Sequence, residues 1–158
     1  EYINSLANTI KTHEFYGKQD KVVFSYHGIP KKYFDEGDPY HCFCQKTSRL
    51  VAEALGLEEN QYITSFQSRL AAAGREWLKP YTSELMEKLP TEGVKKILIL
   101  SPGFSMDCLE TIEEIDEENK EIFLDSGGEA FHYIACLNDN DEHVEAINNL
   151  IANKISQL

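Results

Sequence analysis

The chain has 158 residues, a length that fits one domain with a substantial buried core. Acidic residues outnumber lysines and arginines by 27 to 15, and the resulting net charge of −12 argues against nucleic acid as a partner, because phosphate binding needs clustered cations. No apolar run approaches the ~20 residues of a membrane-spanning helix, and residues 1–16 lack the apolar stretch of a signal peptide.

Strands and helices are predicted to alternate along the chain, because apolar residues recur first at one spacing and then at the other. In chain order we expect a helix near 1–15, a strand at 21–25, a helix near 41–56, a strand at 62–66, a helix near 80–89, a strand at 97–100, an acidic helix over roughly 106–121 and a strand near 131–136. A loop rich in Pro, Gly and Asp is expected from Gly28 to Pro39.

The end of the chain is predicted to be an amphipathic helix. Residues 139–141 can cap it, and its apolar stripe consists of Val144, Ile147, Leu150, Ile151, Ile155 and Leu158. Strands that alternate with helices predict right-handed βαβ units, and therefore a three-layer α/β/α fold around a four-stranded parallel sheet. The strand at 97–100 is apolar enough to be central, whereas the strand near 131–136 is expected at an edge.

Residues 1–158 are expected to form a single α/β domain, since no linker or low-complexity tract divides them. The chain opens at Glu1, inside a predicted helix that has no cap signal before it. We therefore expect these residues to be a piece of a longer protein.

His27 stands at the carboxyl end of the first predicted strand, where Gly28 and Pro30 break the apolar run. Open α/β sheets bind ligands at the carboxyl ends of their strands, which makes this imidazole a candidate for chemistry. A neutral imidazole is a good general base near neutral pH and a good ligand for a ferrous-type metal. From this segment alone, a structural role in which the ring only hydrogen-bonds a neighbouring carbonyl is equally favoured.

Glu110, Glu114 and Glu118 are spaced four residues apart and would form a column on one face of the acidic helix. One interpretation is a solvated acidic face, helped at its start by the helix dipole. The other is an acid/base or metal site, because the carboxyl ends of parallel strands meet at one sheet edge and Glu110 can face the same cleft as His27. A column of like charges would raise the carboxylate pKa values and suit proton or cation transfer.

Other polar and aromatic residues allow two interpretations each. Arg69, just past the second strand, either binds an anion or carboxylate or belongs to a loop-capping network. Trp77 either fills the core or forms an aromatic wall against a flat ligand.

Cys42 and Cys44, next to His41, lack the Cys-x-x-Cys spacing of structural zinc, so neither zinc nor an iron–sulfur cluster is expected. Four cysteines are too few for a disulfide scaffold and favour a cytoplasmic location.

Five motifs together resemble the carboxyl-terminal half of the bacterial-type ferrochelatases, which catalyse the last step of protohaem synthesis. They are FSYHGIP at 24–30, GDPY at 37–40, FQSR at 66–69, WLKPY at 77–81, and SPGF at 101–104 followed by DCLET at 107–111. The resemblance covers nearly the whole chain. It implies a chelatase-like fold, a similar α/β half before this one, and insertion of Fe²⁺ into protoporphyrin IX.

The resemblance also assigns roles to single residues. It implies that His27 and Glu110 are catalytic, that the metal contacts His27, Glu110, Glu114 and Glu118, and that Tyr26, Trp77 and Phe104 lie near the porphyrin pocket. Whether His27 is the base or the first metal ligand stays open. Fe²⁺ is then a substrate, no cofactor is permanently bound, and no iron–sulfur cluster is expected, because the cysteine segment of cluster-bearing members is absent.

Two segments depart from the family pattern. Cys108 stands where some members carry a histidine, and the loop at 70–74 is altered or lengthened, which bears on the placement of Arg75 and Glu76.

Two alternatives to a ferrochelatase remain, namely a related cobalt chelatase and a non-catalytic tetrapyrrole- or metal-binding domain. We expect the isolated chain to be inactive because it holds only one wall of the cleft. Peripheral membrane association of the complete enzyme stays open, although the chain shows no amphipathic anchor.

Overall fold

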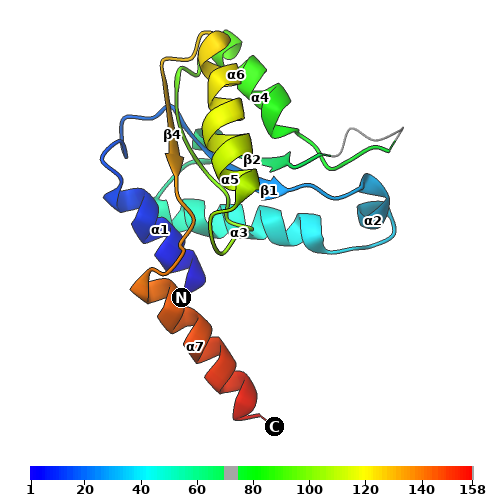
Figure 1. Ribbon diagram of the computed structural model, residues 1–158, viewed down its shortest axis with the longest axis vertical. Coiled ribbons are helices and arrows are strands. Elements are labelled where there is room, and N and C mark those ends of the chain that lie inside the picture. The colour runs from blue at the N-terminus through cyan, green and yellow to red at the C-terminus, as the bar shows by residue number, and fades with distance from the viewer. Residues whose placement is uncertain (70–74, 158) are drawn as a thin grey trace.

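A parallel sheet of four strands forms the centre of the protein (Figure 1). The computed structural model describes residues 1–69 and 75–157. The strands lie side by side in the order β2-β1-β3-β4, with β1 at Lys21–His27, β2 at Tyr62–Gln67, β3 at Lys96–Leu100 and β4 at Ala130–Ile134. All three strand pairs are parallel, and β4 is an edge strand, so the predicted sheet and its edge are confirmed.

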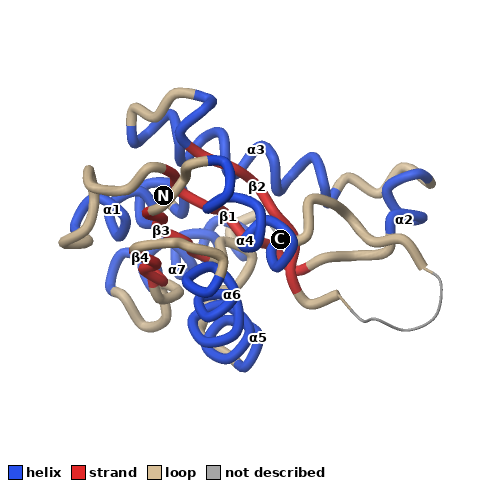
Figure 2. The backbone as a smooth tube through the Cα atoms, turned by 90° about the horizontal axis from the view of Figure 1, so that it is seen from above, coloured by secondary structure: helices blue, strands red, loops and turns tan. Residues whose placement is uncertain are grey.

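Helices precede, connect and follow the strands, which in Figure 2 run between them. They are α1 (Tyr2–Thr12), α2 (Lys31–Asp35), α3 (Tyr40–Leu55), α4 (Thr82–Lys88), α5 (Leu109–Thr111), α6 (Lys120–Asp125) and α7 (Asp141–Ile155). Short 3₁₀ turns occupy η1 (Glu59–Gln61) and η2 (Leu89–Glu92). None of the described helices combines the length and the apolar character needed to cross a membrane.

The structure corrects two predicted boundaries. The segment expected to be a loop from Gly28 to Pro39 contains the short helix α2, which is stabilised by an ion pair of 2.7 Å between Lys31 and Asp35. The acidic helix expected at 106–121 begins only at Leu109 and ends at Asp125.

The middle of the acidic helix is a π-helix, η3 (Ile112–Asn119), between α5 and α6. Such wide turns, with hydrogen bonds from i to i+5, are rare and are often found at functional sites. Ile115 and Asn119 face the interior, and the Asn119 amide donates to the Glu114 carbonyl at 2.6 Å.

Two separate apolar cores cover the two faces of the sheet, because successive strand residues point to opposite sides. Phe24 and Leu98 pack against α1 and α3 in one core. Val23, Ile97 and Ile99 pack against α4, α6 and η3 in the other. This arrangement is the predicted three-layer α/β/α fold, which is thereby confirmed.

The backbones of the neighbouring strands β1 and β2 lie in close contact at their carboxyl ends. His27 is paired with Gln67 in the register of the two strands, and the Gly28 amide donates to the Gln67 carbonyl at 2.8 Å. A Cβ atom on Gly28 would lie 2.9 Å from that same carbonyl oxygen, closer than real Cβ atoms come. A glycine is therefore required at the point where the chain leaves β1 beside His27.

Candidate functional site

A hollow of about 530 Å³ lies at the carboxyl edge of the sheet, where β1, β2 and the acidic helix meet. Its wall brings together the histidine, the acidic column, the arginine and the tryptophan that the sequence analysis singled out. The lining residues are His27, Ser68, Arg69, Trp77, Leu109, Glu110, Glu113, Glu114 and Glu118. The predicted convergence of His27 and Glu110 on one cleft is therefore present in the structure.

The neutral His27 ring is held in one tautomer by the backbone carbonyl of the next residue, Gly28. Nδ1 lies 2.7 Å from the carbonyl oxygen of Gly28, which can only accept a hydrogen bond. In the neutral ring Nδ1 therefore carries the proton, and Nε2 keeps a free lone pair. The carbonyl of His27 accepts a hydrogen bond of 2.8 Å from the Tyr40 hydroxyl, which fixes the backbone below the ring. A free Nε2 suits either a base or a metal ligand.

Gln67 connects the ends of three strands to the backbone that carries Glu110. Its side chain is 2 % exposed, and its Oε1 accepts from the hydroxyls of Ser25 at 2.8 Å and Ser101 at 3.1 Å. Its Nε2 donates to the carbonyl of Glu110 at 2.6 Å. The distance from the sheet edge to the acidic helix is thus set by a buried amide to which the sequence analysis gave no role.

The carboxyl group of Glu110 has a lowered pKa. The main cause is a hydrogen bond from the Cys108 thiol, followed by a backbone N–H and the charge of His27. The expectation that the acidic column raises the carboxylate pKa values is therefore wrong for Glu110. Burial, and then the hydrogen bond with Glu110, raise the pKa of the Cys108 thiol. The pair consists of a thiol that keeps its proton and a carboxylate that is readily ionised.

Glu114 is held by both polar groups of a single residue at the end of β2. The Ser68 amide donates to Oε1 at 2.6 Å, and the Ser68 hydroxyl donates to Oε2 at 3.0 Å. Ser68 has a φ of +60°, a left-handed conformation that is uncommon outside glycine. Such conformations cluster at ligand sites, where the surrounding structure enforces them. Sequence spacing carries no signal for this contact.

Asp107 fixes the start of the acidic helix against the segment after β4. Its carboxylate accepts from the Tyr133 hydroxyl and the Asn138 amide, each at 2.7 Å, and from the Thr111 hydroxyl at 3.1 Å. Burial works against ionisation, but the hydrogen bonds from Asn138, Tyr133 and Cys136 outweigh it, and the pKa of Asp107 is lowered. This second network also escaped the sequence analysis.

Trp77 and Arg69 occupy the wall of the hollow in different ways. Trp77 is largely buried, and the backbone next to it pairs with the segment after β1 through the bond from the Leu78 amide to the Ile29 carbonyl at 3.0 Å. Arg69 lies over the ring of Tyr81, 4.2 Å from its centre, and 3.9 Å from the Glu84 carboxylate. Anion binding by Arg69 and porphyrin contact by Trp77 stay predictions.

Tyr26 does not line the hollow, and a contact between this residue and a porphyrin stays a prediction. It is buried in the core beneath α1 and α3, and its hydroxyl lies 3.0 Å from the Ser48 hydroxyl. Burial raises the pKa of this phenol. Neighbouring strand residues point to opposite faces, so Tyr26 and His27 cannot face the same cleft. Phe104 also lies outside the lining, with its ring centre 6.3 Å from that of His27.

The predicted metal ligands share the hollow but are not gathered into a cage. Within residues 1–69 and 75–157, no cluster of three or more His, Cys, Asp or Glu is close enough to hold a metal ion. Metal contact by His27, Glu110, Glu114 and Glu118 therefore stays a prediction. Cys42 is exposed and Cys44 is buried in the core beside α1, so these two also do not form a paired site.

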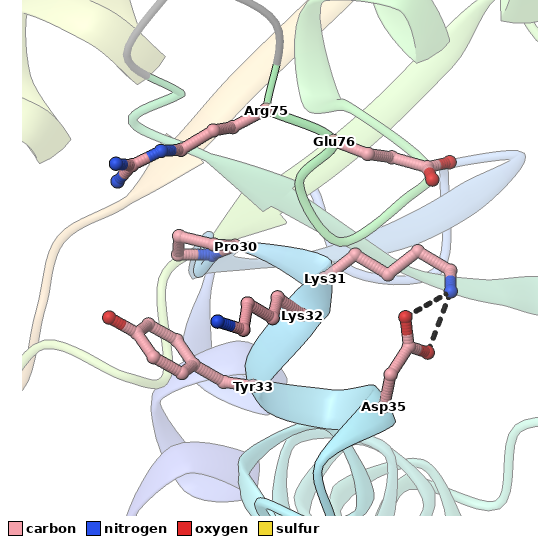
Figure 3. A pocket seen from close by; sticks show the side chains of 7 residues that line it. All are labelled: Pro30, Lys31, Lys32, Tyr33, Asp35, Arg75 and Glu76. Carbon is pink, nitrogen blue, oxygen red and sulfur yellow. Dashed lines mark hydrogen bonds and ion pairs between the residues drawn. The ribbon is translucent and has the colours of Figure 1, made fainter.

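A second hollow, of about 510 Å³, lies between α2 and the segment at Arg75 and Glu76 (Figure 3). Both carboxylate oxygens of Asp35 accept from the Lys31 ammonium there, and the Lys31 amide donates to the Glu76 carbonyl at 2.8 Å. Neither His27 nor Glu110 lines this hollow, so Arg75 and Glu76 lie outside the candidate site. The altered loop at 70–74 falls outside the described residues.

Comparison with known proteins adds an independent line of evidence. The family model for ferrochelatase matches residues 1–155. The ferrochelatase of Marinobacter nauticus is 53% identical over 155 residues, which cover 98% of this chain and 41% of that protein. The ferrochelatase of Hydrogenovibrio crunogenus is 54% identical over 151 residues, with 95% and 39% covered. The chain therefore spans about two fifths of the length of these relatives.

A solved structure shares the fold at much lower sequence identity. The putative cobalamin biosynthesis CbiX protein of Marinobacter aquaeolei superimposes with a TM-score of 0.54 at 11% identity, covering 87% of this chain and 98% of that one. This likeness concerns the fold alone. Identity near one half, and a family match over nearly the whole chain, carry the assignment. The chain belongs to the ferrochelatase family.

Proposed function

We propose that this chain is the carboxyl-terminal domain of a ferrochelatase and that the complete protein inserts Fe²⁺ into protoporphyrin IX, the last step of haem biosynthesis. The observation that carries the proposal is the meeting of His27 and Glu110 in one hollow at the carboxyl edge of the sheet. Membership of the family and the position of the hollow at the strand ends both support it. A cytoplasmic location belongs to the same proposal.

The reaction replaces two pyrrole N–H protons with one ferrous ion, so the site must accept protons as the metal enters. A flat macrocycle turns its nitrogen lone pairs inward, and binding energy used to bend the ring would expose them. In our proposal Nε2 of His27 accepts a pyrrole proton, since Nδ1 already donates to the Gly28 carbonyl. The imidazolium that forms would keep that hydrogen bond.

Glu110 is suited to the positive charge in the reaction, because it lines the hollow together with His27 and its lowered pKa favours the ionised carboxylate. It would hold the ferrous ion or receive the second proton, and Glu114 and Glu118 would continue the path along the helix. In the alternative assignment, Nε2 of His27 is the first metal ligand and not the proton acceptor, and Glu110 takes up a proton. Glu110→Gln tests the carboxylate under either assignment, since it keeps the shape of the side chain and removes the charge that a relay or a ligand needs.

The proposal is tested by following iron and zinc insertion into protoporphyrin spectroscopically with the complete protein. We expect His27→Ala to abolish insertion and to leave porphyrin binding largely intact. A matched control is His13→Ala, because His13 follows α1 and lies outside the hollow. Turnover of the His27→Ala protein at the wild-type rate would overturn the assignment.

The same assay distinguishes the alternatives. A binding domain without activity would hold the tetrapyrrole tightly and give no product, and a cobalt chelatase would prefer Co²⁺ and a reduced tetrapyrrole. We expect the 158-residue chain alone to insert no metal, because it spans only about two fifths of the length of the ferrochelatases that it resembles. Activity of the isolated chain equal to that of the complete protein would contradict this expectation.

A further inference from the structure

Two histidines meet where the end of α1 lies beside the edge strand β4 (Figure 1). His13 is the residue that follows α1, and His132 stands in the middle of β4, opposite Leu98 of β3. Their ring centres are 5.6 Å apart, and the angle between the ring planes is 65°. Both residues are half-buried, and neither lines the candidate site. The pair is therefore a separate cluster of metal-ligating groups.

The two imidazole rings are oriented by one residue, Phe15. The Phe15 amide donates to Nδ1 of His13 at 3.2 Å, so the neutral His13 ring carries its proton on Nε2. The Phe15 ring packs against the His132 ring, with 4.1 Å between the ring centres and 32° between the planes. Both rings are thus held at the same corner of the protein by contacts that leave Nε2 of His13 available.

The separation of the two rings suits two ligands of a single metal ion. Zn²⁺ binds an imidazole nitrogen at about 2.0–2.1 Å, which places the ion about 3.2 Å from the ring centre. Two rings that meet such an ion at a tetrahedral angle have centres about 5.2 Å apart, close to the 5.6 Å observed. A hollow of about 450 Å³ lies beside His13, between α1 and the segment after β4, and leaves room for water ligands.

We propose that His13 and His132 form a binding site for a divalent late first-row metal ion such as Zn²⁺, with water as its remaining ligands. Imidazole is a ligand that Zn²⁺, Cu²⁺ and Ni²⁺ share. Nε2 of His13 would release its proton to water and give its lone pair to the ion. Two side chains make an open site and not a cage of three or more ligands, which residues 1–69 and 75–157 do not contain.

The charges around the pair permit a cation. Burial, and then the charge of His13, lower the pKa of His132, which favours the neutral imidazole that a metal needs. Glu14 is the nearby carboxylate. The two nearby ammonium groups are engaged, because Lys18 donates to the Glu14 carbonyl at 2.9 Å and Lys120 pairs with a carboxylate of η3 at 3.3 Å. The net charge of −12 also attracts cations to the chain as a whole.

An ion at this site would join the end of α1 to the edge of the sheet. The two histidines are far apart in the sequence, so only the folded chain brings their rings together. A metal that binds the folded state and not the unfolded chain stabilises the fold by mass action. The inference does not depend on the proposed insertion reaction, because neither ring lines the hollow of His27 and Glu110.

The test measures Zn²⁺ binding to the complete protein by isothermal titration calorimetry, in a His27→Ala background that removes the imidazole of the hollow. His132→Phe keeps an aromatic ring against Phe15 and removes both ring nitrogens. His13→Asn keeps an acceptor for the Phe15 amide and removes Nε2. Each change should weaken the binding of one Zn²⁺ equivalent by about tenfold or more, because even the groups behind a metal ligand are worth about tenfold to a hundredfold in affinity.

The matched control is His41→Phe in the same background. His41 is also half-buried and also packs against aromatic rings, those of Phe34 and Phe66, but it lies at the start of α3. This change should leave Zn²⁺ binding as it is in the parent protein. Equal Zn²⁺ affinity in all three variants would overturn the proposal, since the ion would then be held elsewhere. So would a parent protein that binds no Zn²⁺.

Urea unfolding gives a second readout on the same proteins. Zn²⁺ should raise the unfolding midpoint of the parent protein and of His41→Phe, because the ion binds the folded state. The rise should be smaller in His132→Phe and in His13→Asn, in which one ligand is missing. A rise of the same size in all four proteins would overturn the proposal, because the stabilising ion would not need the two histidines.

Discussion

Replacing Gln67 tests whether one buried amide holds the sheet edge and the acidic helix together. In Gln67→Ala the carbonyl of Glu110 loses its donor and the hydroxyl of Ser101 loses an acceptor, whereas the hydroxyl of Ser25 keeps Thr82 at 2.8 Å. Each buried polar group left without a partner costs ~1–3 kcal/mol. Two such groups lower the free energy of unfolding by about 2–6 kcal/mol.

The loss is measured by urea unfolding followed by far-UV circular dichroism. With a urea slope of about 2 kcal/mol/M, the midpoint should fall by about 1–3 M. Gln67→Met is a necessary companion, because methionine keeps the volume of the side chain and makes none of its three hydrogen bonds. If the hydrogen bonds are responsible, Gln67→Met should be destabilised as well.

The matched control is Gln45→Ala on the exposed side of α3. It removes the same amide from a helix surface, where such changes stay within about 0.5 kcal/mol. If the midpoint of Gln67→Ala falls no further than that of Gln45→Ala, the reasoning about Gln67 is refuted. If Gln67→Met unfolds like the wild type, packing and not hydrogen bonding explains the effect.

Three further changes probe the same edge of the sheet by urea unfolding. Gly28→Ala should cost about 1–3 kcal/mol, because its Cβ would lie 2.9 Å from the Gln67 carbonyl and force the strand ends apart. Ser68→Ala should cost about 1 kcal/mol by removing the hydroxyl bond to Glu114, and Ser68→Gly should cost less because it relieves the positive φ. The lowered pKa of Asp107 means that its ionised form stabilises the fold above an ordinary aspartate pKa and that this stability disappears as the pH falls through the lower folded value. Asp107→Asn should therefore flatten the loss of stability in acid, measured as unfolding midpoints over a series of pH values.

The strands were predictable because burial on both faces makes them apolar and leaves clear breaks at their ends. Lys96–Leu100 and Tyr62–Gln67 agree with the predicted strands within one residue at each end. Helix α2 was missed because its five residues bury nothing and carry no apolar stripe. It depends instead on contacts distant in sequence, such as the bond from the Lys31 amide to the Glu76 carbonyl at 2.8 Å.

In the site, the prediction that followed from the topology of the sheet agrees with the structure. His27 and Glu110 were expected together because parallel strands share one carboxyl edge, and they line one hollow. Tyr26 was placed near the porphyrin pocket by the family resemblance, and the two-residue period of the strand directs its side chain into the core under α1 and α3, away from the hollow. Gln67 and Ser68 act through contacts made only when the chain is folded, so no spacing reveals them.

Two members of the acidic column, Glu114 and Glu118, lie in the π-helix and line the hollow together with Glu110. In an α-helix, residues four apart lie slightly past one full turn, and in a wider turn closed from i to i+5 they lie slightly short of one, so Glu114 and Glu118 stay on one side of η3 in either geometry. The opposite side of the same segment buries Ile115, which ties the wide turns to the core. Ser68 then fixes Glu114 from the strand end at 2.6 and 3.0 Å. The column predicted from α-helical spacing therefore lines one hollow although its middle is a π-helix, a geometry that the spacing of the glutamates does not reveal.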